Sequence, residues 1–98
     1  MIESGARYVL DARRKHRPNL LEDDHDERRQ RVELLLRHLD IARDVGAEIL
    51  SLWSGALPED VARDEAIPRL EDALDELASA ACTRGIRIGF EPEPGMLI

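Results

Sequence analysis

The sequence contains a single cysteine, Cys82, and this scarcity excludes several kinds of site. No intramolecular disulfide can form, and neither a multi-cysteine zinc site nor a Cys-x-x-Cys redox motif can be built. Such cysteine usage is typical of a reducing compartment, so we expect a cytoplasmic protein. Cys82 itself falls in an apolar helical stretch, where we expect it to be buried as a small hydrophobe.

Long apolar runs and an excess of positive charge are missing as well. No signal peptide is visible at the N-terminus, and no run approaches the length of a membrane span. The 21 acidic residues outnumber the 14 basic ones, which gives a net charge of −7. Neutralising a nucleic-acid backbone or an anionic membrane needs a basic surface, so we expect neither partner. The one basic patch, residues 12–18, is also consistent with a solvated loop.

Apolar spacing predicts alternating strands and helices. The helical spacing covers 26–45 and 66–84, and a glycine closes each helix, Gly46 and Gly85. Short apolar or β-branched stretches predict the strands, over 5–10, 47–54 and 86–91. This order predicts an α/β domain in which crossover helices join three parallel strands. Helices on one face would leave the other face of such a sheet bare.

Several residues refine this picture. Leu20 and Leu21 should anchor an otherwise polar loop, and Asp24 is among the aspartates that should cap the first helix. Arg31 belongs to the polar residues that we place on the solvent face of that helix. Pro68 fits only the first turn of the second helix, so we expect that helix to start no earlier than about residue 66.

The last strand carries the best candidate for chemistry. Side chains alternate across a strand, so the apolar Ile88 and Phe90 should face the helices and Glu91 the opposite face. Pro92 ends the strand, which places Glu91 at its carboxyl end, where α/β folds hold their active sites. Such a carboxylate can bind a hard cation or act as a general base. Alternatively, Glu91 is an ordinary charged residue at the end of a strand, without a functional role.

Three further residues are weaker candidates. Trp53 should end the middle strand on the same face as Glu91, where an indole suits the apolar face of a sugar, although core packing explains it equally well. Glu93 lies between two prolines, which position its carboxylate, but it can also be an exposed loop charge. His16 lies in the basic loop, where a lone histidine is more often incidental. His25 and His38 are assigned no role, and no Ser-His-Asp order, phosphate loop or zinc-helix motif is present.

Three segments carry a resemblance. They are Glu-Ser-Gly-Ala-Arg-Tyr-Val-Leu-Asp-Ala-Arg-Arg-Lys-His-Arg-Pro (3–18), Gly-Ala-Glu-Ile-Leu-Ser-Leu-Trp-Ser-Gly (46–55) and Gly-Phe-Glu-Pro-Glu-Pro-Gly (89–95). Together they resemble the sugar phosphate isomerase/epimerase family of the xylose isomerase-like TIM-barrel superfamily. The resemblance covers only the middle of that barrel, roughly its third to fifth strands. It implies a single partial TIM-barrel domain over 1–98.

The resemblance also implies a function. A divalent metal (Mn²⁺, Mg²⁺ or Zn²⁺) would sit at the barrel mouth, held by acidic and histidine side chains from several strand ends. Glu91 would be the metal ligand of the fifth strand and would also serve in proton transfer. The implied reaction is isomerisation or epimerisation of a small sugar next to a carbonyl. His16, Trp53 and Glu93 would contact the sugar.

The departures from the family pattern leave alternatives open. The later strands, which would supply the other metal ligands, are missing, so we expect a fragment that is inactive alone or that needs a homo-oligomer. An endonuclease-like member of the superfamily is one alternative, but it would use a histidine where this chain has Trp53-Ser54. The other is a non-catalytic piece that binds a partner through its exposed sheet face and open strand edges.

Overall fold

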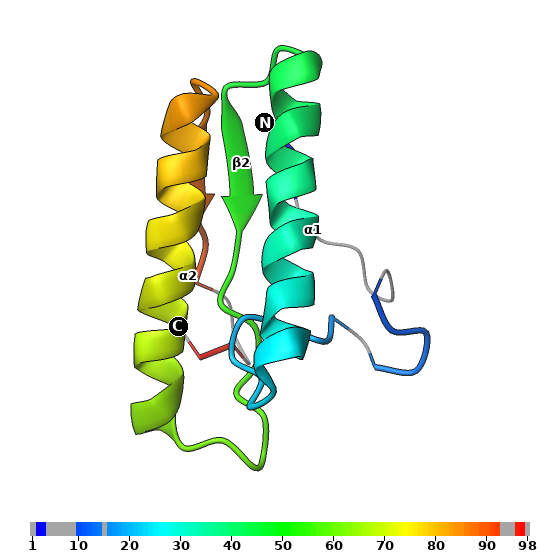
Figure 1. The fold of residues 1–98 in the computed structure, drawn as a ribbon, viewed down its shortest axis with the longest axis vertical. Coiled ribbons are helices and arrows are strands. Elements are labelled where there is room, and N and C mark those ends of the chain that lie inside the picture. The colour runs from blue at the N-terminus through cyan, green and yellow to red at the C-terminus, as the bar shows by residue number, and fades with distance from the viewer. Residues whose placement is uncertain (1, 4–9, 15, 93–95, 98) are drawn as a thin grey trace.

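The computed structural model describes residues 2–3, 10–14, 16–92 and 96–97. These residues form β1 (Ile2–Glu3), α1 (His25–Asp44), β2 (Ile49–Leu52), α2 (Arg63–Thr83) and β3 (Arg87–Phe90). The strands are parallel in the order β1-β2-β3, so α1 and α2 are the crossover connections that the sequence predicts. Both helices pack on one face of the sheet and against each other (Figure 1).

The first strand differs from its prediction. The expected strand over 5–10 falls mostly on residues 4–9, which lie outside the described part of the chain, and Leu10 is not in a strand. The strand that is described, β1, pairs Ile2 with Leu50 and Glu3 with Ser51. The middle and last strands are confirmed, with β2 and β3 each shorter than predicted.

Local hydrogen bonds define the ends of α1. Asp24 caps its start, because the Asp24 side chain accepts from the N–H groups of Asp26 and Glu27 at 2.7 and 3.4 Å. At the other end Gly46 adopts a φ of +76°, and the N–H of Ala47 donates to the carbonyl of Ala42 at 2.9 Å. This left-handed closure confirms the glycine predicted to end the helix. Gly85 ends α2 in the same way, with a φ of +70°.

The prediction for the start of α2 was wrong. The helix begins at Arg63, which makes Pro68 an interior residue rather than a first-turn one. Proline has no N–H, so the carbonyl of Asp64, four residues earlier, lacks its helical donor. Asp64 and Pro68 are both exposed, and water can therefore satisfy that carbonyl. The exposure of the site explains why the helix tolerates the proline.

The core lies between the helices and the sheet. Leu39 of α1, Leu77 of α2 and Leu50 of β2 are completely buried there. Leu20 and Leu21 join the same cluster, which confirms the predicted anchoring of the loop. Ile88 and Phe90 also pack against it, as their strand parity predicts.

Two residues contradict their predicted environments. Cys82 is exposed, not buried, because it follows Ala81 on α2 and so points away from the buried stripe that Ala81 belongs to. Arg31 is buried rather than on the solvent face, with an exposed fraction of 9%.

In the described part of the chain, neither helix is long and apolar enough to cross a bilayer.

Candidate functional site

Glu91 follows β3 directly and is fixed by the sheet. Its N–H donates to the carbonyl of Leu52 at 2.9 Å, which continues the pairing of β2 with β3 by one residue. Its carboxylate Oε1 accepts a hydrogen bond from the Ser51 hydroxyl at 2.7 Å. Ser51 and Glu91 therefore share the sheet face that points away from the helices. The hydrogen bond from Ser51 restricts the orientation of the Glu91 carboxylate.

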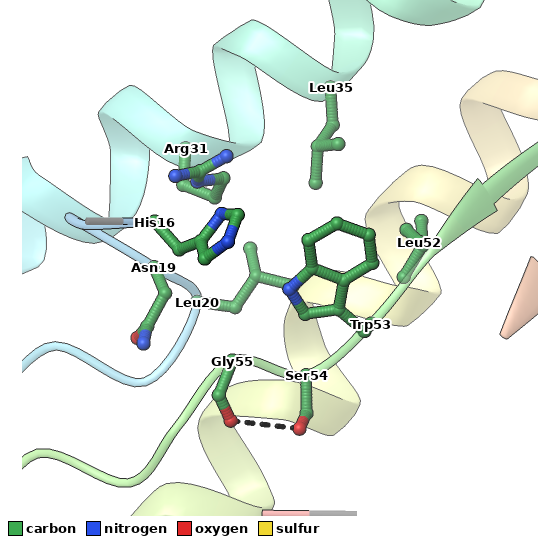
Figure 2. A pocket seen from close by; sticks show the side chains of 9 residues that line it. All are labelled: His16, Asn19, Leu20, Arg31, Leu35, Leu52, Trp53, Ser54 and Gly55. Atoms are coloured by element: carbon green, nitrogen blue, oxygen red, sulfur yellow. Dashed lines mark hydrogen bonds between the residues drawn. The ribbon is translucent and has the colours of Figure 1, made fainter. Parts of the chain in front are cut away.

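Trp53 follows β2 and lies in a different environment from Glu91. Its ring contacts the imidazole of His16 edge to face, with ring centroids 5.5 Å apart and planes at 90°. The indole borders the same pocket as Leu35 of α1, so its surroundings include the helix side of the sheet (Figure 2). Strand alternation does not extend to Trp53, because β2 ends at Leu52. The expectation that Trp53 faces the same way as Glu91 is therefore wrong.

The pocket between His16 and Trp53 is small and rich in hydrogen-bond donors. Its cavity measures about 20 Å³, which is room for roughly one water molecule. Arg31, Asn19 and Ser54 also border it, and no aspartate or glutamate in the described part of the chain does. His16 has a φ of 58°, a left-handed conformation that few residues other than glycine adopt. The left-handed conformation belongs to the backbone of His16, and histidine is among the side-chain-bearing residues enriched in it.

A buried ion pair holds the loop that carries His16. Nε and Nη2 of Arg17 each donate to one carboxylate oxygen of Glu22, the first at 2.8 Å. The N–H of Asn19 also donates to Glu22, at 3.1 Å. Burial alone would raise the pKa of Glu22, but the hydrogen bonds from Arg17 and Asn19 lower it overall. Glu22 therefore stays ionised despite an exposed fraction of only 3%.

Arginines from both helices complete this loop. Arg28 of α1 donates to the carbonyls of Glu22 and Asp23, each at 2.8 Å. Arg31 of α1 donates through Nε to the carbonyl of Pro18, also at 2.8 Å. Arg69 of α2 donates to the carboxylate of Asp23 at 3.1 Å. The loop is thus built from tertiary hydrogen bonds, and neither its ion pair nor its arginine contacts were predicted from the sequence.

Two of the missed residues left a signal in the sequence. Arg31 lies four residues before Leu35 and eight before Leu39, so it occupies the same buried stripe of α1. Glu22 directly follows the anchoring pair Leu20 and Leu21. A charged residue in an apolar stripe, or next to buried anchors, indicates a buried polar contact rather than a solvated side chain.

The described residues do not make a complete metal site. Glu91 is one carboxylate, and no group of three histidine, cysteine, aspartate or glutamate side chains gathers around a common point among the residues described. Glu93 lies outside the described residues. A catalytic divalent ion needs several protein ligands, so Glu91 and Ser51 alone do not fit one. Further ligands would have to come from elsewhere.

His38 also lies outside any cluster of this kind. Its Nδ1 atom is buried and has no hydrogen-bond partner among the described residues. Burial lowers the pKa of His38, and the nearby charges of Arg31 and Arg37 lower it further. The histidine therefore favours its neutral form in the folded chain.

The chain is similar to a known protein family. The model of a family described as xylose isomerase-like TIM barrel matches residues 4–98 of this chain. The match includes both helices, β2, β3, the loop that carries His16, and Glu91.

Proposed function

The chain belongs to the xylose isomerase-like TIM barrel family, and on this premise we propose that it serves in isomerising or epimerising a small sugar next to a carbonyl. The observation that carries the proposal is the position of Glu91, at the carboxyl end of a parallel strand and oriented by Ser51 at 2.7 Å. Barrels of parallel strands hold their active sites at this end. The described elements correspond to part of such a barrel.

In this proposal Glu91 moves the proton. Its carboxylate takes the proton from the carbon next to the carbonyl and, in an isomerisation, returns it to the former carbonyl carbon. An epimerisation needs a second acid on the opposite face of the sugar, from outside the described residues. The Ser51 hydroxyl keeps one carboxylate oxygen in place, so the other is left to face the substrate. We assign the rest of the sugar to His16 and Trp53, which lie in a different environment from Glu91, because an aromatic ring suits the apolar face of a sugar ring. Glu93 contacts it as well.

A divalent ion (Mn²⁺, Mg²⁺ or Zn²⁺) is part of the proposal, with Glu91 as one of its ligands. The remaining ligands come from residues outside the described part of the chain or from another chain. For this reason we assign no step of the reaction to the ion.

Metal binding tests the role of Glu91. We expect calorimetric titration of the chain with Mn²⁺ to show weak binding, and Glu91→Gln to weaken it at least tenfold. The amide keeps the size of the side chain but removes the negative charge that a hard cation requires. The change should leave the fold intact, because the amide oxygen of the substituted side chain can still accept from Ser51.

Glu48→Gln is the matched control for this titration. Glu48 precedes β2 at the opposite end of the sheet, and its side chain is 84% exposed. The control removes the same charge far from the strand ends, so Mn²⁺ binding should stay within twofold of the unaltered chain. Equal Mn²⁺ binding by Glu91→Gln and Glu48→Gln would show that Glu91 is not a metal ligand.

An oligomer is a further part of the proposal. Both helices cover one face of the sheet, which leaves the face that carries Ser51 and Glu91 without a helical layer (Figure 1). A second copy of the chain could cover that face and bring further ligands to Glu91. Sedimentation at micromolar concentration tests this, and a monomer that binds no hydrophobic dye would count against it.

The endonuclease-like reading is less well supported. Trp53-Ser54 follows β2 where that reading needs a histidine, and the chain carries a net charge of −7. The sugar substrate, the absence of nucleic-acid and membrane partners, and the cytoplasmic location stay predictions from the sequence.

A further inference from the structure

Arg31 is a buried cation without a carboxylate partner among the residues that the structure describes. Its exposed fraction is 9%, and its hydrogen bond runs from Nε to the carbonyl of Pro18. No carboxylate of the described residues lies within 4.0 Å of its guanidinium. By contrast, Arg29 and Arg84 each contact a carboxylate, at 2.7 and 2.6 Å. The two terminal nitrogens of Arg31 are therefore left without an anionic partner.

Leaving this charge uncompensated is unfavourable. Burial lowers the pKa of Arg31, and the charge of Glu22 raises it only through space. A guanidinium nevertheless stays protonated in a protein, so the charge cannot be removed by losing a proton. A buried charge is stabilised by a counter-charge or by hydrogen bonds to its remaining donors.

The pocket beside Arg31 is suited to supply that counter-charge from outside. Figure 2 shows the guanidinium next to the imidazole of His16, with the indole of Trp53 on the opposite side of the pocket. None of the described residues around the pocket is acidic, although the chain has 21 acidic residues. The described lining combines the positive charge of Arg31 with polar side chains and no carboxylate, which favours an anion.

We infer that this pocket binds one anionic oxygen group of the substrate, a phosphate or a carboxylate, with Arg31 as its charged partner. The inference rests on the proposed function, because it makes the same His16–Trp53 site selective for a charged sugar. A planar guanidinium presents two parallel N–H groups to such an anion. The cavity of about 20 Å³ admits a single oxygen, so the rest of the group occupies the pocket mouth.

The test uses the fluorescence of Trp53, which is the only tryptophan of the chain. Inorganic phosphate is titrated into the 98-residue chain at constant ionic strength, with chloride as the balancing anion. We expect a saturable change in emission, because the indole borders the same pocket as Arg31. Arg31→Met should weaken phosphate binding at least tenfold. Arg31→Lys should weaken it at least threefold, because lysine keeps the positive charge but cannot donate two parallel hydrogen bonds as a guanidinium does.

Arg37→Met is the matched control, because Arg37 is an exposed arginine of the same helix. Phosphate binding by this variant should stay within twofold of the unaltered chain. Circular dichroism shows which variants fold, and if Arg31→Met does not, Arg31→Lys decides. A chain with no saturable response, or an Arg31 variant that binds phosphate as well as Arg37→Met does, overturns the inference.

Sugars of different charge identify the group and separate the two proposals. A sugar phosphate or a sugar acid should bind the unaltered chain at least tenfold more tightly than the neutral sugar, and Arg31→Met should remove that difference. Equal binding of all three compounds overturns the inference. Phosphate binding and Mn²⁺ binding are measured separately on the unaltered chain. If that chain binds phosphate through Arg31 but does not bind Mn²⁺, the proposed function is overturned and the inference about the pocket is not.

Discussion

Gly55→Ala should lower the free energy of unfolding by about 3 kcal/mol, because it combines backbone strain with a clash. Gly55 has a φ of +91°, where any L side chain is strained. A β-carbon there would lie 2.6 Å from Nδ2 of Asn19 and 2.8 Å from its Cβ. Asn19 cannot move away without losing its hydrogen bonds to Leu21 and Ala56. Chemical denaturation monitored by circular dichroism measures the loss.

Gly46→Ala separates the two contributions. Gly46 has a similar φ of +76°, but a β-carbon there would meet no atom within 4 Å. This variant should therefore lose only about 1 kcal/mol, the strain of the left-handed backbone. Gly55→Ala should also change the emission of Trp53, because Asn19 borders the same pocket, whereas Gly46→Ala should not. Equal losses in the two variants would contradict the close packing of Gly55 against Asn19.

Glu22→Gln should lower the free energy of unfolding by about 2 kcal/mol, since it breaks a buried ion pair. The amide replaces one acceptor oxygen of Glu22 with a donor, which then faces a donor of Arg17 or Asn19. The side chain of Arg17 is 35% exposed, so water offsets part of the cost of leaving it unpaired. For a domain of this size the melting temperature should fall by about 10 °C, which calorimetry can measure.

Glu27→Gln is the matched control for this effect. Glu27 contacts Arg14 at 3.1 Å in a partly exposed pair, and its loss should change the free energy of unfolding by no more than about 0.5 kcal/mol. If both glutamine variants are as stable as the unaltered chain, the Arg17–Glu22 contact does not hold the loop.

The contribution of Glu22 should also disappear in acid. The pKa of Glu22 is lowered in the folded chain from an ordinary value of 4.5, so the folded state favours its ionised form. The resulting stability is fully present above about pH 4.5 and is lost as the pH falls through the folded-state pKa, below that value. The difference in stability between the unaltered chain and Glu22→Gln should therefore shrink below pH 4.5. Asp40 and Glu76 also have lowered pKa values, and the comparison with Glu22→Gln cancels their effect.

The sequence predicts the elements that depend on local patterns. Helical spacing and the closing glycines Gly46 and Gly85 located both helices within three residues at each end. Strand alternation correctly placed Ile88 and Phe90 towards the core. These features depend on periodicity and on backbone conformation, which neighbouring residues determine.

The polar contacts of the site depend on residues far apart in the sequence. Arg31 reaches Pro18 across 13 residues, and Asn19 reaches Ala56 across 37. The residues next to Arg31 in the sequence do not indicate which group accepts its hydrogen bond. Its charge therefore led to the prediction that it lies on the solvent face of the helix. The hydrogen bond between Ser51 and Glu91 was not predicted for the same reason, because the two residues lie 40 positions apart. The strand end that carries Glu91 was predicted from the sequence, but its hydrogen bonds required the tertiary structure.

The arginine contacts of the His16 loop have a consequence for its dynamics. Arg28 and Arg69 hold carbonyls of this one loop from two different helices, and Leu20 and Leu21 bury it in the common core. Such a loop cannot open separately unless α1 and α2 also release it. Amide hydrogens of buried Leu21 should therefore exchange with solvent about as slowly as those of the helix cores. The segment that presents His16 is thus part of the cooperative folding unit, although by its length and charge it resembles a surface loop.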